Sequence, residues 1–246
     1  MNESTTLKRR RLWLPEMEGV MARWYDKQRG TAANIRAYQE RASRLTAGLE
    51  PGASILEVAP GPGYLSIEIA RLDNFHVIGL DISHTMVEIA VGHARQAGVT
   101  VDFRHGDVVA MPFPPESFDL IVCQAAFKNF RQPIAALDQM HRVLRSGGLA
   151  VIEDLGKDAS GSEIDDEVRR QGLSGANAFF TRQVLRGLRR RALPRAEFER
   201  VVAASAFRSG DLRADGIGIE LRLRKQVAVK APTLPTPAGG GGKSAE

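Results

Sequence analysis

Apolar and polar residues follow each other along this chain in blocks whose period changes between two and 3.6, and these blocks predict strands and helices in turn. Short apolar runs bounded by turn residues predict buried strands. Apolar residues spaced three and four apart predict amphipathic helices. The predicted strands span 54–59, 75–81, 99–107, 118–124 and 149–154, and the predicted helices span 16–48, 64–72, 83–96 and 133–144. This alternation is typical of a parallel sheet covered on both faces.

Beyond residue 154 the pattern changes. Residues 155–181 are rich in Gly, Asp and Ser, and residues 182–206 predict a helix that is interrupted near Pro194. Strict alternation follows in residues 211–225, which predicts a hairpin at the edge of the sheet. The apolar residues expected on one face of this hairpin are Ile217, Ile219, Leu221 and Leu223.

These patterns divide the chain into three parts. We expect a helical extension or lid over residues 1–50 and one domain over residues 51–230, in which 155–206 form a helical insertion on the substrate side. Residues 231–246 are a Pro/Gly-rich tail whose composition gives no means of packing, and we expect it to be disordered.

Composition narrows the class of protein. The chain has 246 residues, of which 43% are hydrophobic, and no apolar run approaches the roughly 18 residues of a membrane span. Cys123 is the single cysteine, which excludes an internal disulfide and disfavours a zinc site built on cysteines. We therefore expect a cytoplasmic protein without a bound metal. The N-terminus lacks the apolar stretch of a secretory signal.

The net charge of +5 is unevenly distributed. Residues 182–200 contain seven arginines against two glutamates. Such a stretch can bind nucleic acid or another polyanion, or it can be the solvated face of a helix.

A Gly/Pro-rich turn, "EVAPGPGYLS", follows the first predicted strand. Gly61 and Gly63 remove side chains where a backbone could approach a ligand closely. A dinucleotide fingerprint would place a third glycine where Ser66 stands, which weakens an NAD oxidoreductase as an alternative. The lysine and hydroxyl residue of a Walker A loop are absent from this turn.

The segment Glu57-x-Ala59-x-Gly61-x-Gly63 resembles the acidic-x-Gly-x-Gly-x-Gly loop of class I S-adenosylmethionine (SAM)-dependent methyltransferases, with Ala59 replacing the first glycine. Three further features match the family in the same order along the chain. They are the acidic residues at the ends of the next two predicted strands, the segment "FDLIVCQAAF" and the segment "RVLRSGGLAVIED". The resemblance covers about residues 53–154 and is nearest to the type 11 methyltransferases, which include quinone-biosynthesis and small-metabolite enzymes.

This resemblance implies a Rossmann-like, doubly wound α/β fold with a mostly parallel seven-stranded sheet and an antiparallel C-terminal hairpin. It also implies SAM as cofactor, S-adenosylhomocysteine as product, and in-line transfer of the methyl group to O, N or C of a small organic metabolite. The implied cofactor-binding residues are Tyr25, Glu57, Ala59, Gly61, Gly63, Asp81, Ile82, Asp107, Val108 and Gln124.

The acceptor side is less defined by the sequence. The candidates for catalysis are Tyr25, Lys128 and Glu153, and those for acceptor binding are Phe127, Lys128, Asn129 and Arg186. Lys128 could bind an acidic substrate or point to solvent. Glu153 and Asp154 are adjacent on a strand and face opposite ways, so we expect at most one of them in the pocket.

Two alternatives to small-molecule methylation stay open. One is an rRNA or tRNA methyltransferase that uses the Arg-rich stretch 182–200. The other is a SAM-binding protein without catalytic activity.

Overall fold

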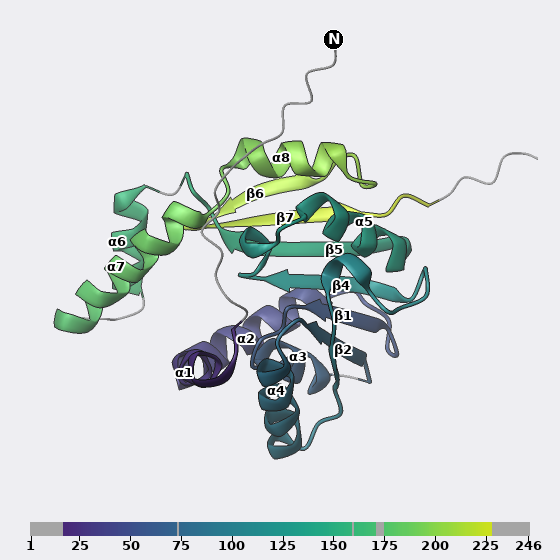
Figure 1. Ribbon diagram of the computed structural model, residues 1–246, viewed down its shortest axis with the longest axis horizontal. Helices are drawn as coiled ribbons and strands as arrows, with labels where there is room; N and C mark the ends of the chain where they lie inside the picture. The colour runs from purple at the N-terminus through teal and green to yellow at the C-terminus, as the bar shows by residue number, and fades with distance from the viewer. Residues whose placement is uncertain (1–16, 73, 159, 171–174, 228–246) are drawn as a thin grey trace, which may run out of the picture.

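A seven-stranded sheet forms the centre of the computed structural model, which describes residues 17–72, 74–158, 160–170 and 175–227 (Figure 1). The strand order is β3-β2-β1-β4-β5-β7-β6. The strands are β1 (Ser54–Val58), β2 (His76–Asp81), β3 (Asp102–His105), β4 (Phe118–Gln124), β5 (Leu144–Leu155), β6 (Asp211–Asp215) and β7 (Gly218–Arg224). The first five are parallel, and β7 is antiparallel to both β5 and β6. The predicted fold class and edge hairpin are confirmed.

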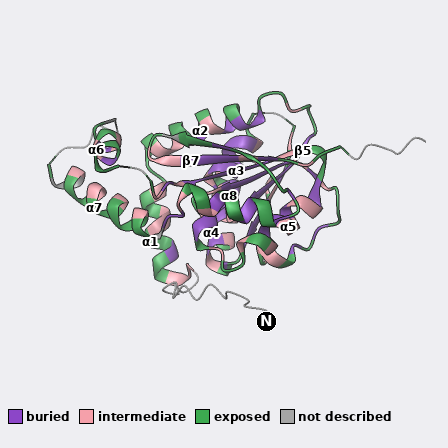
Figure 2. Ribbon diagram, turned by 90° about the horizontal axis from the view of Figure 1, so that it is seen from above, coloured by how far each residue is buried: buried purple, intermediate pink, exposed green. Residues whose placement is uncertain are grey.

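Helices cover both faces of this sheet (Figure 2). They are α1 (Gly19–Arg29), α2 (Ala32–Thr46), α3 (Tyr64–Ala70), α4 (His84–Ala97), α5 (Pro133–Val143), α6 (Gly161–Arg170), α7 (Gly175–Arg191) and α8 (Arg195–Ala204), with single 3₁₀ turns η1 (Val108–Ala110) and η2 (Phe127–Asn129). Apolar residues of α5 and α8 form one core with the sheet, and those of α2 and α3 form another. Burial of this apolar surface is the main force that holds the layers together.

The N-terminal helix differs from the prediction. A single helix over 16–48 is wrong, because the chain breaks at Gly30 and restarts with Thr31 as N-cap. The Thr31 side chain accepts a hydrogen bond from the amide of Asn34 at 3.4 Å, which satisfies one of the free amides at the start of α2. The break lets α1 run in a different direction from α2 (Figure 1).

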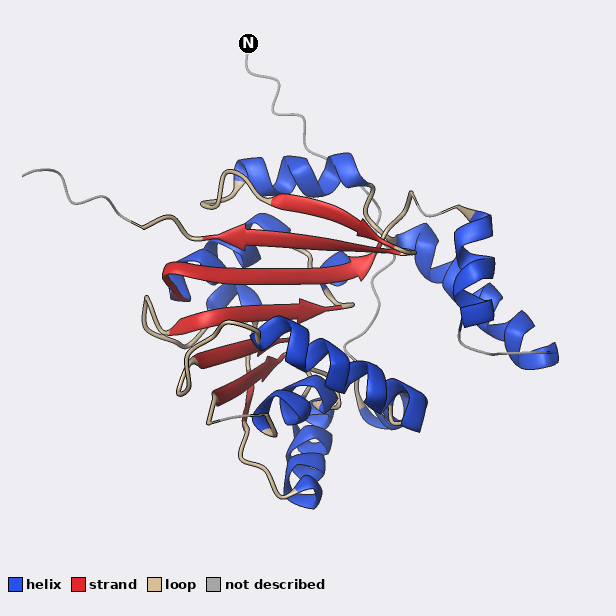
Figure 3. Cartoon of the chain, turned by 180° about the vertical axis from the view of Figure 1, so that it is seen from behind, coloured by secondary structure: helices blue, strands red, loops and turns tan. Residues whose placement is uncertain are grey.

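Two groups of helices lie beyond the carboxyl ends of the parallel strands, where ligands bind in open α/β sheets. Figures 1 and 3 show α1 on one side of this end and the α6–α7 pair on the other. The α6–α7 pair begins within the segment 155–181, where the sequence pattern left the structure uncertain, and it lies at this end of the sheet. The predicted disordered tail, 231–246, lies outside the described residues.

Candidate functional site

The two glycines of the turn after β1 have different roles. Gly63 has φ +80°, and a Cβ there would lie 2.6 Å from the Phe103 ring and 2.9 Å from the Ala90 Cβ. Gly61 has φ +55°, and its Cβ would meet only the Tyr25 ring, at 3.8 Å. Gly63 thus lets the turn pack against β3 and α4, whereas Gly61 presents bare backbone to the cleft under α1.

Ala59 occupies the first glycine position of the motif with φ +55°. A left-handed conformation costs a residue with a Cβ roughly 1–2 kcal/mol. Its amide donates to the carbonyl of Leu80 at 2.8 Å, so the tie to β2 holds the turn in this conformation. Strain of this kind is concentrated at ligand-binding turns.

Asp81 connects the turn to the end of β2. Its carboxylate accepts hydrogen bonds from the amides of Gly61 at 3.0 Å and Ser83 at 2.9 Å. Burial raises the pKa of Asp81, and these two amides act in the opposite direction. A carboxylate has about four acceptor positions, so two remain for the hydroxyls of a ribose diol.

Glu57 ends β1 beneath the same turn and is 2% exposed. Burial raises the pKa of Glu57 to about 7, although the Ser66 hydroxyl donates to its carboxylate at 2.5 Å and favours the charged form. Ser66 therefore has a structural role at the place where a dinucleotide fingerprint has glycine. A carboxyl group poised near neutral pH suits the neighbourhood of a cationic ligand group.

The opposite wall of the cleft comes from α1 and α2. Tyr25, Arg29 and Tyr38 line it together with Glu57 and Gly61. The guanidinium carbon of Arg29 lies 5.9 Å from the centre of the Tyr25 ring and 5.4 Å from that of Tyr38, so two aromatic faces stabilise its charge. Sequence reasoning missed Arg29 and Tyr38. The i, i+4 spacing of Tyr25 and Arg29 was the available signal for Arg29.

Aromatic stacking fixes this wall to the domain. The Tyr64 ring lies between those of Tyr38 and His93, with centroids 5.9 Å and 4.8 Å away. The Tyr64 hydroxyl donates to Asp26 of α1 at 2.8 Å. Glu18, before α1, accepts the amides of His84 and Thr85 at the start of α4. Helix α1 is therefore attached to the rest of the fold at two separate places.

The predicted adenine end lies where β2 and β3 finish. Ile82 is 43% exposed there, and Val108 is half-buried. Asp107 is exposed and accepts the amide of Val109 at 3.1 Å, as the cap of η1. This cap leaves acceptor positions for an adenine amino group, and its assignment as an adenine contact stays a prediction.

Lys128 is buried rather than solvent-facing. Its ammonium lies 2.8 Å from a carboxylate oxygen of Asp154 and also donates to the carbonyl of Ala125. The Lys128 amide donates to the other Asp154 oxygen at 2.9 Å. The pair thus anchors the turn after β4 to the end of β5, and the solvent-facing alternative is wrong.

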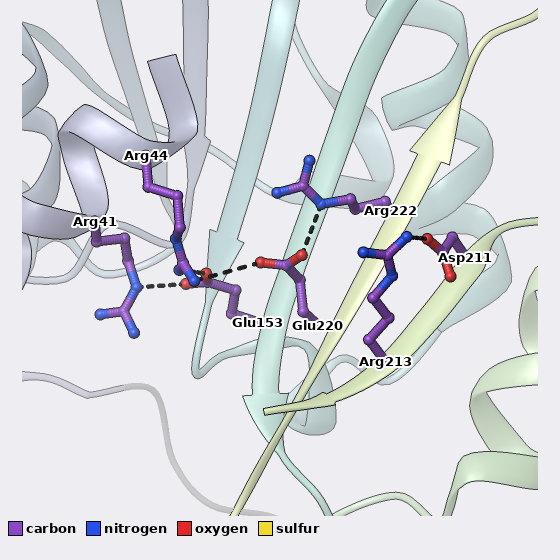
Figure 4. A network of polar contacts seen from close by, with 7 residues as sticks. All are labelled: Arg41, Arg44, Glu153, Asp211, Arg213, Glu220 and Arg222. Atoms are coloured by element: carbon purple, nitrogen blue, oxygen red, sulfur yellow. Dashed lines mark hydrogen bonds and ion pairs between the residues drawn. The ribbon is translucent and has the colours of Figure 1, made fainter. Parts of the chain in front are cut away.

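Glu153 points to the other face of the sheet, as expected from its position beside Asp154. Figure 4 shows it between Arg41 and Arg44 of α2, each with a nitrogen 2.6 Å from its carboxylate. Arg44 also lies 3.8 Å from Glu220, which pairs with Arg222. This network joins α2, β5 and β7, and it gives Glu153 a structural role in addition to its candidacy as a base.

The remaining acceptor candidates do not gather at one place. Phe127 is 1% exposed and packs against Phe130 and Phe198 in the core. Asn129 is exposed after it, and Arg186 is exposed on α7. By contrast, Gln124 lines the cleft, with its amide group beside the Arg41 guanidinium. The core packing of Phe127 disfavours its predicted contact with an acceptor.

Comparison with known proteins agrees with this geometry. Residues 55–148 match the family model of a methyltransferase domain. A demethylmenaquinone methyltransferase from Deinococcus radiodurans is 33% identical over 108 residues, covering 44% of this chain and 45% of the relative. A ubiquinone/menaquinone biosynthesis C-methyltransferase from a Shewanella species is 29% identical over 127 residues, covering 50% and 51%. This chain thus spans about half the length of the curated relatives it matches.

The fold has solved counterparts. A candidate SAM-dependent methyltransferase from Methanococcus maripaludis superposes with a TM-score of 0.69 at 21% identity, covering 90% of this chain and 98% of that protein. This similarity extends the shared fold beyond the matched segment to both ends of the sheet. The match of residues 55–148 to a methyltransferase domain agrees with the predicted family and with SAM as the cofactor class.

Proposed function

From the class I SAM-dependent methyltransferase domain that residues 55–148 form, we propose that this chain transfers the methyl group of SAM to a ring carbon of a small hydroquinone. The observation that carries the donor assignment is the convergence of Glu57, Gly61 and Asp81 on one cleft at the carboxyl edge of the sheet. The acceptor class rests on the quinone methyltransferases that match the same segment. We place the reaction in the cytoplasm, where the thiol of Cys123 stays reduced.

The proposed orientation of SAM follows from charge. Its methionine end lies between Glu57, which faces the ammonium group, and Arg29, which pairs with the carboxylate. Its ribose diol donates to Asp81, and its adenine lies against Ile82 and Val108. The ammonium and carboxylate groups of the donor then each face an opposite charge in the cleft, which favours SAM over a neutral nucleoside.

The transfer itself needs little acid–base chemistry at the donor. The nucleophilic ring carbon forms a bond to the methyl carbon while the carbon–sulfur bond of SAM breaks. The electron pair of the broken bond stays on sulfur. A reduced hydroquinone supplies the electron-rich carbon, and the ring proton is lost afterwards to a base or to water. The protein mainly aligns the two carbons and excludes water. Tyr25, which lies over Gly61, is the candidate nearest the donor to do so.

Replacing Arg29 should separate recognition of the SAM carboxylate from recognition of the rest of the cofactor. We expect Arg29→Met to weaken SAM binding by about tenfold or more, because a hydrogen bond between charged groups is lost. Binding of decarboxylated SAM should change by less than about twofold. Calorimetry with both ligands measures this, with Arg23→Met on the exposed side of α1 as control. Equal losses for the two ligands would contradict the proposed clamp.

The pKa of Glu57, about 7, predicts how SAM affinity depends on pH. The negative form faces the SAM ammonium, so affinity should rise about tenfold from pH 6 to pH 8 as Glu57 ionises. Glu57→Gln should remove this rise, and Glu50→Gln, an exposed change in the loop before β1, should keep it. A wild-type affinity that is flat between these pH values would overturn the assignment.

The same group affects the stability of the unliganded protein in the opposite sense. Its folded pKa lies above the ordinary value of 4.5, so its contribution is complete below about pH 4.5 and is lost as the pH rises through 7. The loss is about 3 kcal/mol. SAM binding should offset part of it, because the ligand favours the ionised form.

Calorimetric titration with SAM and with NAD tests the donor assignment. We expect saturable binding of SAM and S-adenosylhomocysteine and no comparable binding of NAD. Tighter binding of NAD than of SAM would contradict the donor assignment and favour an NAD oxidoreductase.

A further inference from the structure

The outer face of α7 is unusual for the surface of a domain. Helices α6 and α7 pack on each other beyond the carboxyl ends of the strands and project from the sheet (Figures 1 and 3). The inner side of this pair has its own packing and pairing partners, because Ile164 and Val168 of α6 are fully buried and Arg182 of α7 pairs with Asp165 at 2.5 Å. The outer side of α7 therefore does not serve the packing of the pair.

Large apolar side chains are concentrated on this outer side. Phe180, Val184 and Leu188 are 67%, 58% and 37% exposed, and their i, i+4, i+8 spacing places them in one stripe along the helix. Together with Phe179, they are four of the eleven large apolar side chains that are exposed in the described part of the chain. A contiguous exposed apolar stripe on a soluble domain marks a surface that contacts a partner.

Positive charge accompanies the stripe. The helix sequence "GANAFFTRQVLRGLRRR" contains five arginines and no acidic residue. Arg186 and Arg190 are exposed and, four residues apart, form a row along α7. Arg186 stands two residues from both Val184 and Leu188, so this row lies on a different side of the exposed surface from the apolar stripe. A helix with apolar and aromatic residues on one side and cations on another has the composition of helices that lie in the interface of a bilayer.

We propose that α7 binds the surface of a membrane containing anionic phospholipid, with the apolar stripe in the headgroup region and the arginines on lipid phosphates. A second copy of the chain fits this face less well, because two Arg-rich surfaces would repel each other across a twofold axis. RNA would use the arginines but would leave Phe180, Val184 and Leu188 without an apolar environment. The proposal does not depend on the identity of the acceptor.

Helix α1 offers a second contact at the same end of the molecule. It exposes Val20, Met21 and Trp24, with Arg23 and Lys27 exposed between and after them. Figures 1 and 2 show α1 and α7 at the same end of the sheet. Binding through these helices would place the wall of the cleft that α1 forms near the lipid. In the described residues, no helix is long and apolar enough to cross a bilayer.

Flotation with lipid vesicles tests the proposal on the full chain. We expect the protein to float with vesicles of phosphatidylcholine plus phosphatidylglycerol, much less with phosphatidylcholine alone, and less as salt is raised. Phe180→Ser/Val184→Ser and Arg186→Gln/Arg190→Gln should each lower the partition coefficient about tenfold or more. Ile134→Ser/Arg208→Gln, a matched pair of exposed changes away from α7, should not.

Three results would overturn the proposal. The first is wild-type protein that stays unbound with both kinds of vesicle. The second is binding of transfer RNA that survives Phe180→Ser/Val184→Ser while vesicle binding is absent. The third is a dimer in sedimentation analysis that Phe180→Ser/Val184→Ser dissociates, with no binding to lipid. SAM affinity measured without vesicles reports on the proposed function separately, so the two proposals can fail independently.

Discussion

Asp81→Asn is expected to weaken SAM binding at least tenfold. The carboxylate accepts an amide hydrogen from Gly61 on one oxygen and from Ser83 on the other, and an asparagine can accept on only one side. The side-chain NH₂ group of the asparagine would face one of these two backbone N–H donors, and the repulsion would disturb the turn that holds the ligand. The change also removes the negative charge that receives the ribose hydroxyls, and hydrogen bonds to charged groups contribute about 1.5–3 kcal/mol.

Calorimetric titration measures this effect, and thermal unfolding shows that the variant is folded. Asp102→Asn is the matched control, because Asp102 lies on the neighbouring strand β3 and pairs only with exposed Arg104 in the described contacts. We expect the control to bind SAM as the wild type does. An Asp81→Asn variant with unchanged affinity would refute the ribose assignment.

Lys128→Met should lower the free energy of unfolding by about 3–5 kcal/mol. The side chain of Asp154 is completely buried, and removing its cation leaves a buried carboxylate held only by the amides of Lys128 and Leu155. An unpaired buried charge is the costly case for internal ion pairs. Denaturant unfolding measures the change. Arg145→Met, which breaks the exposed pair with Asp119, should cost less than about 1 kcal/mol.

A second variant separates the pair from the lysine alone. Lys128→Met/Asp154→Leu should recover part of the lost stability, since no buried charge remains. If Lys128→Met unfolds within about 0.5 kcal/mol of the wild type, the lysine does not anchor the turn, and its role as an acceptor-binding group returns.

Much of this architecture follows from local pattern. The strand 118–124 was predicted with its observed bounds because its apolar run is flanked by a Pro-rich loop and a change of pattern. The hairpin followed from period-two alternation, and Ile219, Leu221 and Leu223 are buried on one face. The residues of the donor site could be predicted from the sequence for the same reason. They lie at the ends of consecutive strands, and the topology of a parallel sheet brings such ends together.

What the sequence did not reveal depends on contacts between distant segments. The burial of Lys128 requires Asp154, 26 residues later, and no periodicity reports such a pairing. The break at Gly30 was hidden because good helix formers stand on both sides of it. Arg29 enters the site only because this break directs α1 over the turn after β1, where Arg29 and Glu57 line the same cleft.

Methyl transfer to a hydroquinone tests the central claim most directly. The purified chain is incubated with SAM carrying a trideuterated methyl group and with a chemically reduced naphthoquinone that lacks a methyl group on its quinone ring. Asp81→Asn serves as the binding-deficient control, and mass spectrometry follows both products. We predict S-adenosylhomocysteine in equal amount with an acceptor that carries one trideuteriomethyl group on carbon. Tight SAM binding without formation of either product from reduced quinones would contradict the proposal and favour a SAM-binding protein of another kind.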